Sequence, residues 1–354
     1  MARPLFVTDP NLARLPMVAA ALASLRAAGV SAELFSDIRP NPVESNITAG
    51  VAAFRAGGHD GVIAIGGGSA LDAGKLIAFV TAQVRPVWDF EDVGDGWTRA
   101  STDGIAPVVA VPTTAGTGSE VGRAAVVTNE ATHTKKIIFH PRMMPKVVIC
   151  DPELTVGMPP AITAGTGMDA LAHCLEAYCG AFYHPLADGI AAEGVRLVKE
   201  NLVRAVKDGR DIEARAHMMA AAAMGATAFQ KGLGAIHALS HPVGALYDTH
   251  HGMTNAVFMP YVLMFNRPVV EERIKRLAAY IGLRPSFQAF LDWVLALRAD
   301  IGVPHMLSGL KVGDEQIDRI IAMAVEDPTA GGNPRPFDKR AARTVFKRAL
   351  EGRL

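Results

Sequence analysis

Short apolar runs alternate with helical patterns over the first 150 residues of the chain. Between the first three runs, apolar positions recur at the spacing of a helix, up to Ala28 and again up to Ala56. The apolar runs cover residues 5–8, 32–35, 62–65, 108–111 and 147–150. Strands that alternate with helices are typical of βαβ units. The pattern therefore predicts an α/β fold with a parallel sheet.

After Asp151 the strand-like runs end and helical patterns follow one another. From Pro160 onward the chain is rich in Ala, Leu and Met, and Gly and Pro residues predict the breaks between helices. These predicted breaks lie at Gly180, Pro185, Gly209, Gly232, Pro242, Pro260 and Gly302. We therefore predict two domains, an α/β domain over residues 1–156 and an all-helical domain over residues 157–354.

The composition narrows the classes of protein that fit this pattern. The 354 residues include 35 Lys and Arg against 35 Asp and Glu, and this balance argues against a protein that binds nucleic acid through its charge. Hydrophobic residues make up 50% of the chain, which is enough for a full core. The most apolar segment, residues 218–229, is shorter than the roughly 18 residues of a membrane span, so we expect a buried helix there and no membrane partner.

The N-terminus and the cysteines favour a cytoplasmic protein. Asp9 and Pro10 interrupt the N-terminal segment before an apolar stretch of signal-peptide length can form. Cys150, Cys174 and Cys179 are odd in number and form no Cys-x-x-Cys pair, so they predict neither a disulfide framework nor a thiolate zinc site. We therefore expect the reducing environment of the cytoplasm.

A glycine-rich turn directly follows the third apolar run. Glycines in the sequence Gly66-Gly67-Gly68-Ser69 let the backbone approach a phosphate closely, and the helix predicted after them would direct its N–H groups at the anion. The turn is not a Walker A loop, because Ser69 replaces a required glycine and Leu76 replaces the Ser or Thr. It predicts a site for a nucleotide pyrophosphate, with a turn that binds no ligand as the alternative.

A second loop, rich in hydroxyl groups, follows the predicted strand at residues 108–111. Its sequence over residues 112–120 is Pro-Thr-Thr-Ala-Gly-Thr-Gly-Ser-Glu, so four hydroxyl side chains can bond to a polar ligand. Ligands of open α/β sheets bind at the carboxyl ends of the strands. We therefore expect the two loops to face one site.

Acidic and imidazole side chains recur at helical spacing in the second half of the chain. Asp169 and His173 are four residues apart, as are His237 and His241, so each pair lies on one face of its predicted helix. The pair His250-His251 follows in a glycine-bearing turn. One carboxylate with several imidazoles suits a divalent ion such as iron or zinc. Because no Glu stands between His237 and His241, the pattern is not that of a zinc protease.

Together these motifs resemble the iron-containing, group III alcohol dehydrogenases, and the resemblance extends over nearly the whole chain. The matching segments are residues 8–10, 40–42, 66–69, 112–120, 151–155, 167–173 and 237–252. The resemblance implies a dehydroquinate synthase-like architecture. In it, a Rossmann-like N-terminal domain binds a nicotinamide nucleotide, a helical C-terminal domain binds the metal, and the active site lies in the cleft between them. It also implies a homodimer or a larger homo-oligomer.

The same resemblance assigns roles to individual residues. It implies the metal ligands Asp169, His173, His237 and His251. His251 is preferred to the adjacent His250 because the step of fourteen residues from His237 matches the family. His241 would be the catalytic histidine, which binds no metal and lies close to substrate and nicotinamide. The implied nucleotide ligands are Gly67, Gly68 and Ser69, with Thr113, Thr114 and Thr117 in the second loop and Lys135 at the ribose.

Cofactor choice depends on the end of the second predicted strand, where the family has an Asp that selects NAD. Counting back from Pro40-Asn41-Pro42 places Ser36 at that position and Asp37 one residue later. An Asp there would bind ribose hydroxyls and repel a 2′-phosphate. We therefore expect Asp37 to favour NAD, with NADP as the alternative, and iron as the metal, with zinc as its competitor.

The implied reaction is reversible hydride transfer between a primary alcohol, or its aldehyde, and NAD(P). A small hydroxy acid such as 4-hydroxybutyrate is the alternative substrate if Arg123 and Lys231 stand near the pocket, although a surface or structural role suits both cations better. A polyol oxidoreductase of the glycerol dehydrogenase type, a dehydroquinate synthase-like lyase and a nucleotide-binding protein without activity are further alternatives. The set of one Asp and three His favours the alcohol dehydrogenase.

Overall fold

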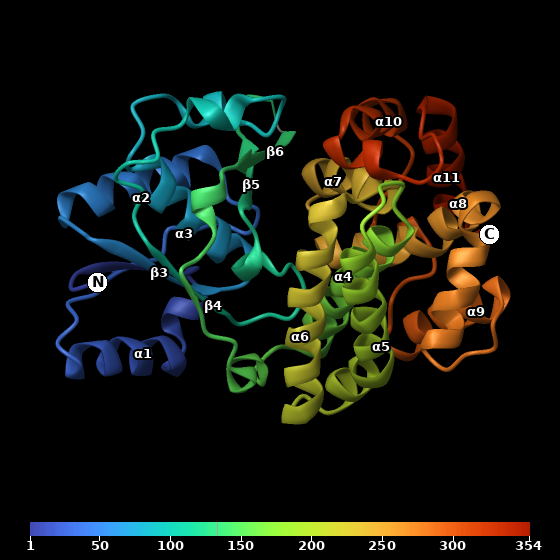
Figure 1. Cartoon of the computed structure of the whole chain (residues 1–354), viewed down its shortest axis with the longest axis horizontal. Helices are drawn as coiled ribbons and strands as arrows, with labels where there is room; N and C mark the ends of the chain where they lie inside the picture. The colour runs from blue at the N-terminus through green and yellow to red at the C-terminus, as the bar shows by residue number, and fades with distance from the viewer. Residues whose placement is uncertain (133) are drawn as a thin grey trace. The chain divides into compact units, whose positions relative to one another are not determined.

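The computed structural model describes residues 1–132 and 134–354. The chain forms two compact units, one of Met1–Thr114 with Ser119–Leu154 and one of Ala115–Gly118 with Thr155–Leu354 (Figure 1). Each unit contains its own buried apolar clusters. The first unit is α/β and the second is helical, as the hydrophobic pattern predicts.

A five-stranded parallel sheet forms the centre of the first unit. Its strands are β1 (Pro4–Val7), β2 (Glu33–Phe35), β3 (Gly61–Gly66), β4 (Val108–Pro112) and β7 (Val147–Val148). Their order across the sheet is β2-β1-β3-β4-β7, and Val62 of β3 pairs with both Leu5 and Val108. Every pair in this sheet is parallel, which confirms the predicted fold class. β7 is shorter than the predicted run at 147–150.

Helices and a small hairpin complete the first unit. Its helices are α1 (Pro16–Ala27), α2 (Glu44–Ala56) and α3 (Gly68–Val80). The side chains of Leu76, Ile77 and Phe79 on α3 are completely buried. An antiparallel pair, β5 (Ala124–Asn129) and β6 (Thr134–Phe139), lies outside the main sheet. Both strands are missing from the sequence predictions, although apolar runs stand at residues 124–127 and 137–139.

Eight α-helices make up the described part of the second unit, in which no residue is assigned to a strand. They are α4 (Pro160–Cys179), α5 (Pro185–Lys207), α6 (Ile212–Ala228), α7 (Ala235–Tyr247), α8 (His251–Tyr280), α9 (Phe287–Asp300), α10 (Ile317–Glu326) and α11 (Lys339–Glu351). α4 packs against α5, α6 and α8 and is buried along almost its whole length (Figure 1). None of the described helices combines the length and the apolar character that crossing a bilayer requires.

Two of the predicted helix breaks are wrong. Pro242 lies inside α7, and Pro260 lies inside α8. A proline in a helix interior removes one hydrogen bond and costs about 3 kcal/mol. Both prolines stand among buried apolar residues, so tertiary packing of α7 and α8 outweighs this local cost.

Candidate metal centre and nucleotide loops

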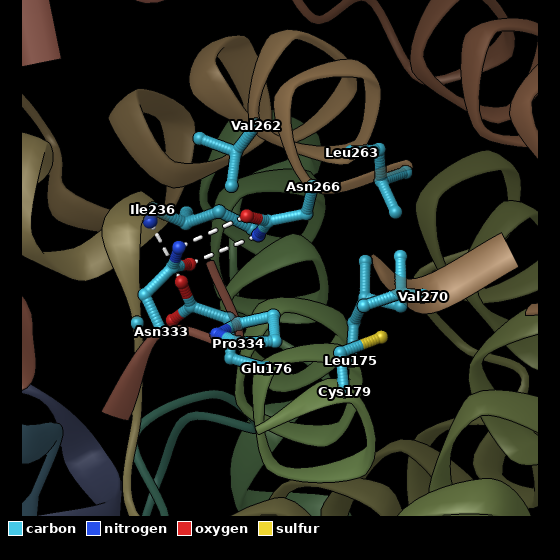
Figure 2. Close-up of a pocket in the computed structure, with 11 residues that line it drawn as sticks. Leu175, Glu176, Cys179, Ile236, Val262, Leu263, Asn266, Val270, Asn333 and Pro334 are labelled. Atoms are coloured by element: carbon cyan, nitrogen blue, oxygen red, sulfur yellow. Dashed lines mark hydrogen bonds between the residues drawn. The ribbon is translucent and has the colours of Figure 1, made fainter. Parts of the chain in front are cut away.

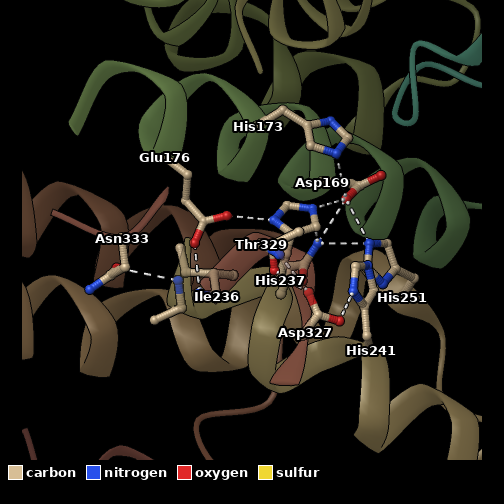
Figure 3. A network of polar contacts seen from close by, with 12 residues as sticks. Asp169, His173, Glu176, Ile236, His237, His241, His251, Asp327, Thr329 and Asn333 are labelled. Carbon is tan, nitrogen blue, oxygen red and sulfur yellow. Dashed lines mark hydrogen bonds and ion pairs between the residues drawn. The ribbon is translucent and has the colours of Figure 1, made fainter. Parts of the chain in front are cut away.

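Three helices bring a carboxylate and three imidazoles together inside the second unit. The Oδ1 atom of Asp169 lies 3.7 Å from Nε2 of His173, 3.7 Å from Nε2 of His237 and 3.5 Å from Nε2 of His251 (Figure 3). Asp169, His173 and His237 are all buried, and their ligand atoms lie within 4.8 Å of one another. Donor atoms at about 2.1 Å from one tetrahedral ion stand about 3.4 Å apart, so the observed spacing fits a single divalent metal.

Local helix geometry explains this convergence. Asp169 and His173 are one turn apart on α4, and His237 lies in the first turn of α7. His250 is the N-cap of α8, where its Nδ1 accepts a hydrogen bond from the backbone N–H of Met253 at 3.3 Å. The cap therefore occupies His250 and leaves His251, the first residue of α8, to reach Asp169.

Burial and neighbouring charges act in opposite directions on the pKa values of the cluster. Burial alone would raise the pKa of the Asp169 carboxyl, but the surrounding imidazoles hold it well below its usual value. Burial lowers the pKa of His173 to about 4, so that this imidazole is neutral. Burial would also lower the pKa of His237, but Glu176 and Asp169 outweigh it and raise the pKa to about 9. An ionised carboxylate among imidazoles is a donor set that iron and zinc both accept.

Asn255 lies at the centre of this cluster, although the sequence analysis does not predict it. Its Nδ2 donates to Oδ1 of Asp169 at 2.8 Å and lies 3.2 Å from Nε2 of both His237 and His251. Asn255 is one helical turn beyond His251 on α8. That four-residue step is the one signal in the sequence that could have identified it.

Glu176 binds the far side of His237 and is also missing from the sequence predictions. Its Oε2 lies 2.5 Å from Nδ1 of His237, and its Oε1 accepts the backbone N–H of Ile236 at 2.6 Å (Figure 3). Glu176 follows Asp169 by seven residues and His173 by three, so all three share one face of α4. Metal-binding histidines commonly donate their second N–H to such a carboxylate.

His241 has a different carboxylate partner. Its Nδ1 lies 2.8 Å from Oδ2 of Asp327, and its ring stacks on that of His251 with 5.4 Å between the ring centroids. The other oxygen of Asp327 accepts bonds from the backbone N–H and the hydroxyl of Thr329. Burial would raise the pKa of Asp327, but the contacts with His241 and Thr329 hold it below its usual value. Asp327 was not predicted, since it lies 86 residues from His241.

In the first unit, the glycine turn joins β3 to the N-terminus of α3. Gly66 has a φ of +148°, which favours glycine, and an added Cβ at Gly67 would lie 3.2 Å from the Thr114 side chain. Gly67 is the N-cap of α3, so the free N–H groups of Gly68 and Ser69 lie at the positive end of the helix. The backbone N–H of Thr113 donates to the carbonyl of Gly66 at 2.9 Å. The start of the second loop therefore adjoins the first.

The other predicted nucleotide ligands, Thr117, Lys135 and Asp37, lie in three separate segments of the chain. Thr117 belongs to Ala115–Gly118, which groups with the second unit. Lys135 lies in β6, opposite Thr128 of β5. Asp37 follows β2 with an exposed side chain, while its carbonyl accepts a hydrogen bond from Asn46.

A buried lysine fastens the segment that follows the second loop to α3. The Lys75 ammonium is 1% exposed and donates to the carbonyls of Ser119 and Ala124 at 3.0 and 2.5 Å. Asp72 lies 3.1 Å from this ammonium and accepts the Ser119 hydroxyl at 2.5 Å. No local pattern in the sequence singles out Lys75 or Asp72, because the Ser119 groups that they bind lie more than 40 residues away.

The two cations considered for binding an acidic substrate are both engaged in other contacts. Lys231 donates to the Ala177 carbonyl at 2.9 Å and to Asp188 at 2.7 Å, so its charge is already balanced inside the helical unit. The Arg123 guanidinium lies 5.1 Å from the centre of the Phe139 ring. Both arrangements agree with the structural roles that the sequence analysis favoured for these residues.

Two family models match the chain, one over most of each unit. The family model for iron-containing alcohol dehydrogenase matches residues 1–152, and the model for the C-terminal part of the Fe-containing alcohol dehydrogenase family matches residues 163–350. The chain therefore belongs to the iron-containing alcohol dehydrogenase family, which confirms the resemblance found in its sequence.

Individual relatives agree with this assignment. The chain is 38% identical to 4-hydroxybutyrate dehydrogenase of Cupriavidus necator, over 99% of this chain and 91% of the relative. It is 35% identical to the solved structure of a 1,3-propanediol oxidoreductase, with a TM-score of 0.93 over 98% of this chain and 92% of that one. A sulfoacetaldehyde reductase from Bifidobacterium kashiwanohense, solved in complex with NAD+, is 29% identical with a TM-score of 0.86 over 98% and 90% of the two chains.

These findings confirm the predicted class of activity. The protein is an oxidoreductase that transfers hydride between an alcohol or aldehyde and a nicotinamide nucleotide. The family is named for its iron, and the sulfoacetaldehyde reductase among the relatives was solved with NAD+.

Proposed function

We propose that Asp169, His173, His237 and His251 hold Fe²⁺, with Zn²⁺ as the competing ion, and that the enzyme oxidises a small primary alcohol with NAD. The convergence of three imidazole Nε2 atoms on one oxygen of Asp169 carries this proposal. Because iron accepts more than four ligands, three imidazoles and one carboxylate leave it a coordination position open to substrate. When bound, the metal acts as a Lewis acid that lowers the pKa of the substrate hydroxyl.

His241 is the group that we propose to accept the hydroxyl proton. Its Nδ1 is engaged by Asp327, which leaves Nε2 as the proton acceptor. The His241 side chain is 14% exposed, so a proton taken up there has a way to solvent. In the balanced reaction the alcohol carbon gives a hydride to NAD+, the hydroxyl gives a proton to His241, and the products are the aldehyde and NADH.

We assign the nucleotide to the loops at the carboxyl ends of β3 and β4. Gly67, Gly68 and Ser69 would bind the pyrophosphate at the N-terminus of α3, where backbone N–H groups and the helix dipole favour an anion. The hydroxyls of Thr113, Thr114 and Thr117 and the ammonium of Lys135 would make further contacts. Asp37 would bind the ribose and select NAD over NADP.

Two substrates compete in this proposal. A neutral primary alcohol suits a helical unit in which Lys231 is already paired with Asp188. 4-Hydroxybutyrate is the second candidate, because a relative 38% identical to this chain is a 4-hydroxybutyrate dehydrogenase. Its carboxylate would need a cation other than Lys231.

NADH formation by anaerobically iron-loaded protein tests the proposal. We would compare 1-butanol with 4-hydroxybutyrate at equal concentrations and subtract a control treated with a chelator. Faster oxidation of 1-butanol would support the neutral substrate, and faster oxidation of 4-hydroxybutyrate would support the hydroxy acid. Protein that binds iron and NAD but forms no NADH with either compound would overturn the proposed reaction.

We further propose that the enzyme is a cytoplasmic homodimer or larger homo-oligomer. The family resemblance supports the assembly, and three free cysteines support a reducing compartment. Sedimentation equilibrium of the purified protein tests the assembly, and a single species with a mass near 37.4 kDa would contradict it.

A further inference from the structure

We infer that Glu176 is a positioning residue that fixes His237 in the one tautomer able to bind metal. This inference rests on the metal site proposed above. Glu176 is 6% exposed and lies on α4, whereas His237 lies on α7, 61 residues further along the chain. The side chain of Glu176 therefore links the two helices that supply three of the four proposed ligands.

The contact between Glu176 and His237 determines which ring nitrogen carries the proton. Oε2 of Glu176 lies 2.5 Å from Nδ1 of His237, and an ionised carboxylate can only accept a hydrogen bond. When His237 is neutral, its one proton therefore stays on Nδ1. Nε2, on the opposite side of the ring, then points its lone pair toward the other proposed ligands.

The second oxygen of Glu176 holds the backbone that carries His237. Oε1 accepts the N–H of Ile236 at 2.6 Å, and Oδ1 of Asn333 accepts the N–H of Ala235 at 3.3 Å. The N-cap residue, Gly234, has no side chain to supply these acceptors. An added Cβ at Gly234 would lie 3.0 Å from Oδ1 of Asn333 and 3.1 Å from Oε1 of Glu176. Glycine at this position thus lets two distant side chains cap α7 directly.

A pair of asparagines anchors this cap. Asn266 and Asn333 each donate a side-chain hydrogen bond to the other at 2.9 Å, and both are buried (Figure 2). They line a cavity of about 20 Å³ together with Glu176, and apolar residues such as Leu175 and Val270 complete its lining. The polar side chains that line the cavity are therefore bonded to one another and to α7. The rest of the lining is mostly apolar.

A single isosteric substitution can separate the roles of the two Glu176 oxygens. In Glu176→Gln, the amide oxygen can still accept the N–H of Ile236, but the amide NH₂ then faces Nδ1 of His237. A donor at that position favours the tautomer with the proton on Nε2, which cannot bind metal. The substitution should therefore preserve the cap of α7 while it impairs the metal site.

Metal affinity, measured by competition between a chelator and the whole protein loaded with Co²⁺, tests this inference. Glu176→Gln should weaken binding by about 10- to 100-fold and change the Co²⁺ absorption spectrum, because second-sphere partners of metal-binding histidines have effects of that size. Two variants serve as controls. Glu272→Gln changes an exposed carboxylate that pairs with Lys275 and should leave affinity unchanged. Asn333→Ala should lower the melting temperature of the metal-free protein and leave its Co²⁺ affinity nearly unchanged.

A spectroscopic measurement distinguishes positioning from general stabilisation. In Zn²⁺-loaded protein labelled with ¹⁵N-histidine, the Nδ1 proton of His237 should give a strongly downfield signal that Glu176→Gln loses and Asn333→Ala keeps. Equal affinity and an unchanged signal in Glu176→Gln would overturn the inference. So would a melting temperature of metal-free Glu176→Gln as low as that of Asn333→Ala. Unmodified protein that binds no Co²⁺ would instead overturn the proposed metal site itself.

Discussion

The two units build their candidate sites from different chemical groups. In the first unit, the loops after β3 and β4 offer backbone N–H groups and hydroxyls. The charges of the buried Lys75 and the partly buried Asp72 hold the chain rather than face a ligand. In the second unit, the charged groups are themselves the proposed ligands, because Asp169 and three imidazoles converge.

This difference determines how each site should respond to mutation. A pyrophosphate bound by several backbone N–H groups and a helix dipole loses little when one side chain changes. A metal bound by four side chains loses a large part of its binding free energy with each ligand. Single substitutions should therefore have larger effects in the helical unit than in the α/β unit.

The largest effect should follow removal of one proposed ligand. We expect His237→Ala to weaken metal binding roughly 1000-fold, which is about one quarter of the binding free energy of a four-ligand site. NAD affinity, measured by calorimetry on the same sample, should stay within error of the unmodified protein. Loss of both metal and NAD binding would show that the two units do not bind their ligands independently.

A smaller effect should follow removal of the proposed proton acceptor. We expect His241→Ala to slow alcohol oxidation by roughly 100-fold or more, as loss of a general base commonly does. Its metal content, measured by atomic emission, should remain that of the unmodified protein. If the metal were lost instead, His241 would be a ligand and its contact with Asp327 would have to rearrange.

Metal affinity should also depend on pH through His237. The pKa of His237 is raised to about 9 in the metal-free protein, so a proton competes with the metal below that pH. We expect affinity to fall about fivefold from pH 9 to pH 8, because one proton must leave per metal bound and half of the His237 side chains already carry it at pH 9. The contribution of His237 to the stability of the metal-free protein should follow the opposite trend. It should be fully present below pH 6.5 and be lost as the pH rises through 9. An affinity that is flat over this range would contradict protonation of His237.

Features set by local sequence could be predicted, and features set by distant partners could not. The parallel sheet follows from the alternation of apolar runs with helices, and the pairs Asp169 with His173 and His237 with His241 follow from helical spacing. Glu176, Asp327 and Lys75 were missed because each acts on a residue more than 40 positions away. Pro260 was misjudged for a related reason, since only tertiary packing keeps α8 helical there.

In the first unit, loss of the Ser119 hydroxyl should have a moderate effect on NAD affinity. Ser119→Ala removes the hydroxyl that donates to Asp72 at 2.5 Å, while Lys75 still holds the Ser119 carbonyl. We expect NAD affinity to fall about fivefold, because one hydrogen bond of about 1 kcal/mol orders the segment that follows the second nucleotide loop. Metal affinity in the same variant should not change. A fall in NAD affinity as large as the loss of metal in His237→Ala would remove the contrast between the units.

The smallest effect should come from Asp37, where an exposed charge acts across solvent. Asp37→Asn removes the negative charge proposed to repel a 2′-phosphate, and exposed charge pairs contribute about 0.2 to 1 kcal/mol. The ratio of kcat/KM for NADP to that for NAD should therefore rise only about threefold, and it should rise less at high salt because the charge is screened. Ser36→Ala is the matched control, since it changes the neighbouring side chain without changing the charge. A rise in both variants would assign cofactor choice to the shape of this turn, and a rise in Asp37→Asn alone would assign it to charge.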